Sequence, residues 1–217
     1  MSSHSANRTL VLMRHGQAQA GEGGPDFTRR LTPRGRRQAM DAGRSLAAAG
    51  LVPDLVIVSG ATRAQETWAR VAEGLSLGLP RGGAEAAASD AATQVSGAPV
   101  SAESAAGGTA SDADAAPGFR VVVSDALYSG YVRELVGVLG EAVGGADPGI
   151  VLVVAHNPTV SAAASRLSGL GSAPDALARA EAGLPTSSYA VLRLGAIGWA
   201  EVGHLPLHLA EVVTPAA

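Results

Sequence analysis

Three short apolar runs set the fold class of this 217-residue chain. They cover residues 8–13 (RTLVLM), 54–59 (DLVIVS) and 150–155 (IVLVVA), and each is continuous and rich in branched side chains. Such runs are typical of strands inside a parallel sheet, because both faces of that sheet are covered. We expect residues 121–123 to form a shorter strand, and the alternating segment 188–194 to form an edge or antiparallel strand.

Helical segments separate these runs. Thr32 and Pro33 have the pattern of an N-cap followed by a first helical residue, and Gly50 supplies a stop. Further helices are expected over residues 62–75, 131–143 and 158–167. Alternating strands and helices predict an α/β fold, with a mostly parallel central sheet flanked by helices on both faces.

The chain has the length of one domain, and we predict a single domain over residues 1–217. Residues 84–118 interrupt it, because they are mostly Ala, Ser, Gly, Asp and Thr and offer little apolar surface to bury. We expect a flexible low-complexity insertion there, in which Asp112 and Asp114 keep the segment soluble. The five-residue apolar run near the start is too short for a signal peptide or a membrane span, so we expect a cytoplasmic protein without membrane contact.

Missing residue types narrow the chemistry. All sixteen basic residues are Arg, and the absence of Lys excludes a P-loop and Schiff-base catalysis. The absence of Cys excludes disulfides, thiolate metal ligands and a cysteine nucleophile. No Gly-x-Ser-x-Gly elbow supports a serine hydrolase, and no ligand spacing predicts a metal, so no cofactor is expected. A net charge of −3 gives no general basic field for nucleic acid.

Polar residues follow three of the expected strands at their carboxyl ends. Arg14 and His15 follow the first strand, Arg63 lies just after the second, and His156 follows the third. Ligands bind at this end of an open parallel sheet, so we expect these four side chains to converge. His4, His204 and His208 have no such setting and are expected to be structural or exposed.

This combination suits phosphoryl transfer. A guanidinium presents a planar fork of donors that matches phosphate oxygens and keeps its charge at working pH. A neutral imidazole attacks phosphorus to form phosphohistidine, and neighbouring guanidiniums favour its neutral form. Helices that begin after the strands aim free N–H groups at the anion.

The motifs around these residues resemble the histidine phosphatase (phosphoglycerate mutase-like) superfamily. LVLMRHGQA (10–18) resembles its Arg-His-Gly signature, while SGATRAQET (59–67) and VVAHNPTV (153–160) resemble its second and third motifs, in the family's order. RRLTPRGRRQA (29–39) and LPTSSYAVLRL (184–194) are most similar to the SixA-type phosphohistidine phosphatase branch. The resemblance covers nearly the whole chain outside residues 84–118 and implies the superfamily's three-layer fold.

The resemblance also implies roles. His15 would be the phosphorylated nucleophile, and the phosphoryl oxygens would be bound by Arg14, Arg63 and His156. Gln17 and Asn157 would be pocket neighbours, and Arg29 would contact substrate. Two residues depart from the pattern, because Gly60 and Arg30 each stand where Pro is usual.

The leaving group decides the expected substrate. Alkyl phosphates need a general acid, and the matching region (residues 123–136) offers Asp125, Tyr128 and Glu134 without a recognisable donor motif. Phosphohistidine has a labile P–N bond, so we expect a phosphorylated substrate that is a phosphohistidine-bearing protein or another phosphoramidate. A small-molecule phosphomonoesterase that uses Asp125 or Glu134 is the alternative, and a catalytically silent phospho-ligand sensor is a third reading. A mutase is disfavoured by the short chain, and no oligomeric state is indicated.

Overall fold

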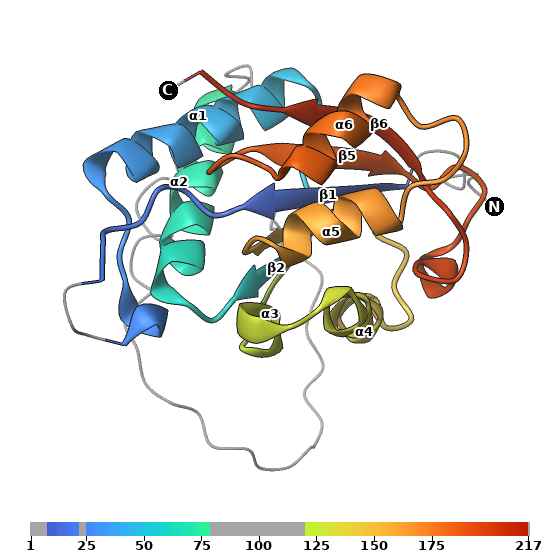
Figure 1. Cartoon of the computed structure of the whole chain (residues 1–217), viewed down its shortest axis with the longest axis horizontal. Coiled ribbons are helices and arrows are strands. Elements are labelled where there is room, and N and C mark those ends of the chain that lie inside the picture. The colour runs from blue at the N-terminus through green and yellow to red at the C-terminus, as the bar shows by residue number, and fades with distance from the viewer. Residues whose placement is uncertain (1–7, 22–24, 79–119, 217) are drawn as a thin grey trace, which may run out of the picture. The chain divides into compact units, whose positions relative to one another are not determined.

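The computed structural model describes residues 8–21, 25–78 and 120–216 (Figure 1). In this part of the chain six strands form one sheet in the order β3-β2-β4-β1-β5-β6. The strands are β1 (Thr9–Arg14), β2 (Leu55–Ser59), β3 (Arg120–Ser124), β4 (Ile150–Ala155), β5 (Tyr189–Arg193) and β6 (His208–Val213). The first four strands in the sheet order run parallel, whereas β5 is antiparallel to both β1 and β6.

The helices follow the strands closely. They are α1 (Pro33–Ala48), α2 (Thr62–Gly78), α3 (Ala126–Ser129), α4 (Val132–Val143), α5 (Thr159–Arg166) and α6 (Pro174–Ala182), with 3-10 turns η1 (Asp26–Thr28) and η2 (Trp199–Glu201). The Thr32 side chain accepts a hydrogen bond from the Gly35 N–H, which confirms the expected N-cap of α1. None of the helices in the described ranges is long and apolar enough to cross a membrane.

The sheet separates two apolar cores, as its continuous apolar runs predict. In β1, Leu10 and Leu12 face a core shared with α4, α5 and α6, whereas Val11 and Met13 face a core shared with α1 and α2. Successive side chains of a strand point to opposite faces, so a strand that is covered on both sides needs apolar side chains at nearly every position. The expectation of a sheet flanked by helices on both faces is confirmed (Figure 1).

The last strand of the sheet was not expected from the sequence. β5 is antiparallel as expected, but β6 lies beyond it and forms the edge of the sheet. A register shift in the β5–β6 pairing breaks the alternation of β6, where Leu209 and Val212 are the buried positions. His4 and residues 84–118, which include Asp112 and Asp114, lie outside the described residues, so what we expect of them stays a prediction.

Candidate active site

The register of the sheet brings the two histidines together. In the β1–β4 pairing Arg14 lies opposite Ala155, and the main-chain N–H of His15 donates to the Ala155 carbonyl at 3.0 Å. His15 and His156 therefore follow neighbouring strands at the same level, and their ring centroids are 4.9 Å apart. The convergence expected at the carboxyl ends of β1, β2 and β4 is present in the geometry.

Hydrogen bonds define the tautomer of His15. Its Nδ1 lies 2.7 Å from the Gly16 carbonyl, which only accepts, so Nδ1 carries the proton. The Nε2 atom accepts from Arg63 Nε at 3.2 Å and therefore holds the lone pair. Burial, and then the charges of Arg63, Arg14 and Arg29, lower the pKa of His15 to about 4, although its bond to Gly16 opposes this. The ring is neutral near pH 7, and its lone pair lies on the side of Arg63.

Close backbone packing holds the turn after His15. A side chain at Gly16 would place its Cβ 2.7 Å from the carbonyl oxygen of Gly35, in the first turn of α1. The Gly16 N–H donates to the Thr67 hydroxyl at 2.9 Å, on the same helix as Arg63. Gly16, whose carbonyl bonds to His15 Nδ1, is thus held between α1 and α2.

Arg63 is held from its far side by Asp26. Its two terminal nitrogens donate to the main-chain oxygen of Asp26 at 2.7 Å and to the carboxylate at 2.9 Å, while Nε faces His15. Only 7% of Arg63 is exposed, because it lies in the first turn of α2 behind β2. The guanidinium is thereby fixed in one orientation beside the imidazole.

Asp26 links further residues of the site, and the sequence analysis missed it. Its carboxylate also accepts from Arg29 at 2.6 Å and from the Tyr128 hydroxyl at 2.8 Å. The bond from Arg29, together with those from Tyr128 and Arg63, holds the pKa of this carboxyl well below its usual range. The Tyr128 ring lies edge-on to His156, with 5.7 Å between the ring centroids. No motif marked Asp26, and its three-residue spacing from Arg29 was the one available signal.

His156 is buried and is oriented by the last residue of β2. Its Nε2 lies 2.8 Å from the hydroxyl of Ser59, whereas its Nδ1 has no hydrogen-bond partner within the described part of the chain. Burial is the main cause that lowers the pKa of His156 to about 3, with a further contribution from His15. A neutral ring with one unpartnered nitrogen is therefore placed beside His15.

Two more buried polar atoms lack a hydrogen-bond partner. Arg14 donates through one terminal nitrogen to the Leu184 carbonyl at 2.8 Å, but its Nε is buried without a partner. The hydroxyl of Ser187 is also unpartnered, and this residue has a positive φ of 60° while its N–H donates to the carbonyls of Arg14 and His15. Within the described residues, all the buried side-chain polar atoms that lack partners belong to segments around His15. Polar groups in such a condition call for a ligand or a functional explanation.

The other candidate residues have different positions. Asn157 donates to the Leu184 carbonyl at 2.9 Å and so supports the same loop as Arg14. Gln17 is exposed and bonds through its side chain and main chain to Thr32 at the start of α1. Both therefore brace neighbouring loops, while their expected substrate contacts stay predictions.

The two candidate acids lie on the α3–α4 side. Glu134 accepts from the Tyr131 N–H at 2.9 Å and pairs with Arg133, and these bonds lower its pKa. Asp125 packs against Gly60, where a Cβ would come within 1.7 Å of its carboxylate oxygen. This contact gives a physical reason for glycine at a position where the resemblance suggested proline.

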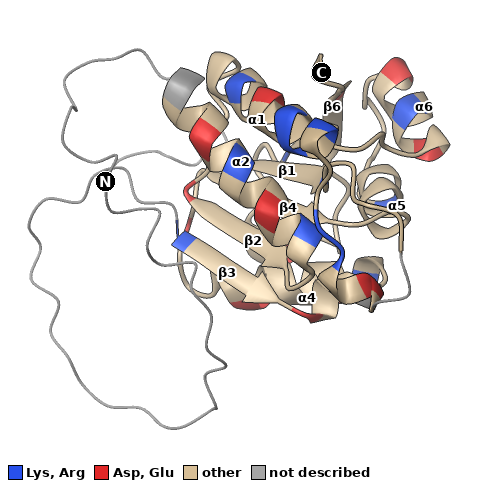
Figure 2. Ribbon diagram, turned by 90° about the vertical axis from the view of Figure 1, so that its left-hand side faces the viewer, with Lys and Arg blue, Asp and Glu red and all other residues tan. Residues whose placement is uncertain are grey.

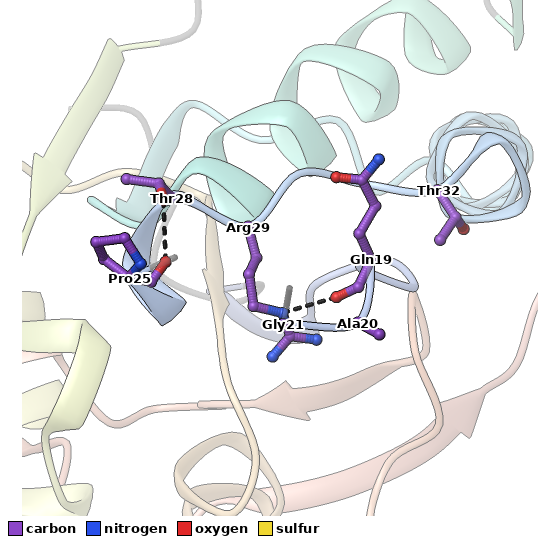
Figure 3. Close-up of a pocket in the computed structure, with 7 residues that line it drawn as sticks. All are labelled: Gln19, Ala20, Gly21, Pro25, Thr28, Arg29 and Thr32. Atoms are coloured by element: carbon purple, nitrogen blue, oxygen red, sulfur yellow. Dashed lines mark hydrogen bonds between the residues drawn. The ribbon is translucent and has the colours of Figure 1, made fainter. Parts of the chain in front are cut away.

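A surface hollow of about 430 Å³ lies beside this cluster (Figure 3). Arg29 lines it and donates through Nε to the Gln19 carbonyl at 2.7 Å, and Thr32, the N-cap of α1, forms another wall. Arg30, which also stands where the resemblance suggested proline, is exposed and pairs with Glu66 on α2. The Leu31 N–H donates to the same carboxylate, so the segment before α1 is held against α2. No group of three or more His, Cys, Asp or Glu gathers as a metal site among the residues that the structure describes.

Comparison with known proteins agrees with this geometry. A sequence profile of the histidine phosphatase superfamily (branch 1) matches residues 10–82, which hold Arg14, His15 and Arg63. About a third of the chain thus matches the histidine phosphatase superfamily, in the part that holds the first two motifs. A 2,3-bisphosphoglycerate-dependent phosphoglycerate mutase from Bartonella bacilliformis is 41% identical over 73 residues, which are 30% of this chain. The match spans about a third of that relative, 34% of its length.

Solved structures extend the likeness to almost the whole chain. One described as a phosphohistidine phosphatase SixA from Nakamurella multipartitia is 28% identical with a TM-score of 0.64, covering 97% of this chain and 98% of that one. A second structure, described in the same way and from Agrobacterium tumefaciens, is 21% identical with a TM-score of 0.62. It covers 96% of this chain and 99% of that one. The chain therefore has the fold of SixA-type structures.

Proposed function

We propose that this chain is a histidine phosphatase that cleaves protein phosphohistidine, or another phosphoramidate, through a phosphorylated His15. The observation that carries the proposal is the lone pair of His15 Nε2 beside Arg63, with unpartnered buried polar atoms of Arg14, His156 and Ser187 in the adjoining segments. Each of these groups can donate to an oxygen of a tetrahedral anion. Together they supply a nucleophile and its electrostatic setting.

The first step transfers the phosphoryl group. His15 Nε2 gives up its hydrogen bond from Arg63 Nε and attacks phosphorus in line with that lone pair. A new P–N bond forms, and the P–N bond to the substrate breaks. A substrate imidazole that carries a proton on its other nitrogen leaves as a neutral ring and takes the bonding electron pair with it. Charge on the transferring group is stabilised by Arg14 and Arg63, whose donors are already fixed in position.

The second step consumes water. The water oxygen attacks phosphorus, the P–Nε2 bond returns its electrons to His15, and inorganic phosphate leaves with both water protons. Throughout this cycle Nδ1 keeps its proton, because it donates to the Gly16 carbonyl. His15 returns to its starting tautomer without a separate proton shuttle.

The carboxyl groups around the site favour a labile bond in the substrate. A general acid must carry a proton at working pH, yet the pKa values of Asp26 and Glu134 are both lowered by their hydrogen bonds. Neither group is protonated near pH 7, so neither suits an alkoxide leaving group. The 28% identity to a structure described as a phosphohistidine phosphatase supports the same choice.

One observation keeps a small-molecule phosphomonoesterase as the second candidate. The Asp125 carboxylate lies against Gly60. Gly60 directly follows Ser59, the last residue of β2, whose hydroxyl orients His156. A carboxylic acid there would serve an alkyl ester. Loss of alkyl phosphatase activity in Asp125→Asn, with aryl phosphate turnover kept, would identify this acid and overturn the phosphoramidate choice.

The decisive experiment compares wild type with His15→Ala on a histidine-phosphorylated peptide, phosphoramidate and an alkyl phosphate. We expect the substitution to abolish turnover of every substrate, and we expect radiolabel from phosphoramidate to be trapped on His15 as acid-labile phosphate. His208→Ala is the matched control, because that imidazole is exposed on β6. An absence of both turnover and trapped label in the wild type would favour a silent sensor.

A further inference from the structure

A run of arginines leads into the first turns of α1. Between residues 29 and 37 the chain carries five arginines and no acidic residue, although the whole chain has a net charge of −3. Figure 2 shows basic positions along α1 and in the segment before it. Positive charge is therefore concentrated on one small part of an otherwise acidic protein.

These arginines differ in whether they are neutralised. Arg29 pairs with Asp26, and Arg30 pairs with Glu66. Arg34 and Arg37 are exposed and form no ion pair with any residue that the structure describes. Two other helical arginines do sit beside acids, because Arg44 pairs with Asp41 and Arg70 pairs with Glu73. Arg166 and Arg179 are exposed without an ion pair in the described part of the chain, but they lie singly on α5 and α6.

The placement of Arg34 and Arg37 does not favour folding. Arg34 lies in the first turn of α1, at the positive end of the helix, and that turn contains no acidic residue; Arg37 lies one turn further on. They are also three positions apart on the helix, where two like charges repel each other. Residues that break a local stability rule are expected mainly at functional sites, so a binding role is the explanation to test for these two charges.

This turn of α1 borders the catalytic loop directly. The carbonyl oxygen of Gly35 packs against Gly16, the residue after the nucleophile, and Thr32 bonds to Gln17. The hollow lined by Arg29 and Thr32 lies between the loop after β1 and the start of α1 (Figure 3). A chain that presents a phosphorylated residue to His15 would extend naturally over this surface.

We propose that Arg34 and Arg37 form a docking surface for an acidic segment of the phosphoprotein substrate, which rests on the proposed function. Carboxylates next to the phosphorylated residue would pair with these arginines and raise the rate of productive encounter. The surface is too small and too isolated in a net-negative protein to act as a nucleic-acid site. Its contribution belongs in kcat/KM and in salt dependence, since neither arginine contacts the reacting atoms.

The test uses two histidine-phosphorylated peptides that differ only in flanking Glu or Gln residues. For the wild type at low salt, we expect the Glu peptide to have a kcat/KM about three- to tenfold higher, with the advantage lost in high salt. In Arg34→Gln/Arg37→Gln the ratio between the peptides should fall to near one. The matched control, Arg44→Gln/Arg70→Gln, removes two charges from paired positions and should keep the wild-type ratio.

Fluorescence anisotropy with the unphosphorylated Glu and Gln peptides separates this proposal from the catalytic one. The wild type should bind the Glu peptide more tightly, and the Arg34/Arg37 variant should lose that preference, whether or not any phosphohistidine is hydrolysed. The docking surface is refuted if the variant keeps the preference, or if the control loses as much of it. A preserved binding preference without phosphohistidine turnover would overturn the proposed function alone.

Discussion

Asp26 accepts hydrogen bonds from both terminal nitrogens of Arg63, and the remaining nitrogen, Nε, faces His15. One contact is made by the carboxylate and the other by the main chain, so the orientation has two independent supports. Asp26 thereby positions the guanidinium that lies beside His15. Under the proposed function, it would compete with a bound phosphoryl group for the same donors.

Asp26→Asn should separate these two effects. We expect kcat to fall about tenfold, which corresponds to roughly 1.4 kcal/mol, because the main-chain contact with Arg63 remains while the charged one is lost. Inhibition by inorganic phosphate should strengthen, since Arg63 is released from a competing anion. Steady-state kinetics with phosphate inhibition measures both, with Asp41→Asn as the control. A lower kcat with weaker phosphate inhibition would contradict the competition.

Acid should destabilise the protein through its two buried imidazoles. Their pKa values fall from an ordinary 6.5 to about 4 for His15 and about 3 for His156 in the folded state. Between pH 6.5 and about 4, the unfolded chain binds protons at these rings that the folded protein does not bind. Stability therefore decreases as pH falls through this window and is unaffected by these groups above it.

Urea unfolding at a series of pH values measures this effect. The slope of unfolding free energy against pH between 4 and 6.5 should be smaller in His15→Gln/His156→Asn than in the wild type. His208→Gln, which changes an exposed ring, should keep the wild-type slope. Equal slopes in all three proteins would show that the two imidazoles titrate alike in the folded and unfolded states.

The sequence was sufficient to predict the main sheet and the four residues at its rim. Continuous apolar runs identify strands that are covered on both sides, and the residues after parallel strands share one edge. His15 and His156 are 141 positions apart in the sequence, yet this rule alone predicts that they lie close together. The strand order and the irregular edge strand β6 lie beyond such patterns, because a register shift erases the alternation.

Asp26 and Ser187 could not be found in the same way. Asp26 enters the site from a 3-10 turn, where no periodicity fixes the direction of a side chain. Ser187 depends on a positive φ and on main-chain bonds to Arg14 and His15, which a sequence does not display for a non-glycine residue. Both belong to loops whose path is set by tertiary contacts.

A side chain at Gly60 should require the Asp125 carboxylate to move. Gly60→Ala places a Cβ within 1.7 Å of the oxygen of this exposed side chain, and we expect a cost of about 0.5–1 kcal/mol in unfolding free energy as the carboxylate turns aside. In an Asp125→Ala background the same change should cost less, which a double-mutant cycle in urea detects. Gly137→Ala is the control: nothing lies near its Cβ, so it should stabilise α4 by about 0.5–1 kcal/mol. An equal cost of Gly60→Ala in both backgrounds would remove Asp125 as the cause.

Ser59 should matter for catalysis through His156. Its hydroxyl is fully buried and lies 2.8 Å from His156 Nε2, so Ser59→Ala leaves that nitrogen without its partner and frees the ring to adopt the other tautomer. We expect about 1–3 kcal/mol lower stability and a reduced kcat with a smaller change in KM. Ser188→Ala is the matched control, because it removes an equally buried hydroxyl that bonds to Thr214 instead. Nitrogen NMR of His156 reports the tautomer directly, and a wild-type tautomer ratio in Ser59→Ala would exclude this positioning role.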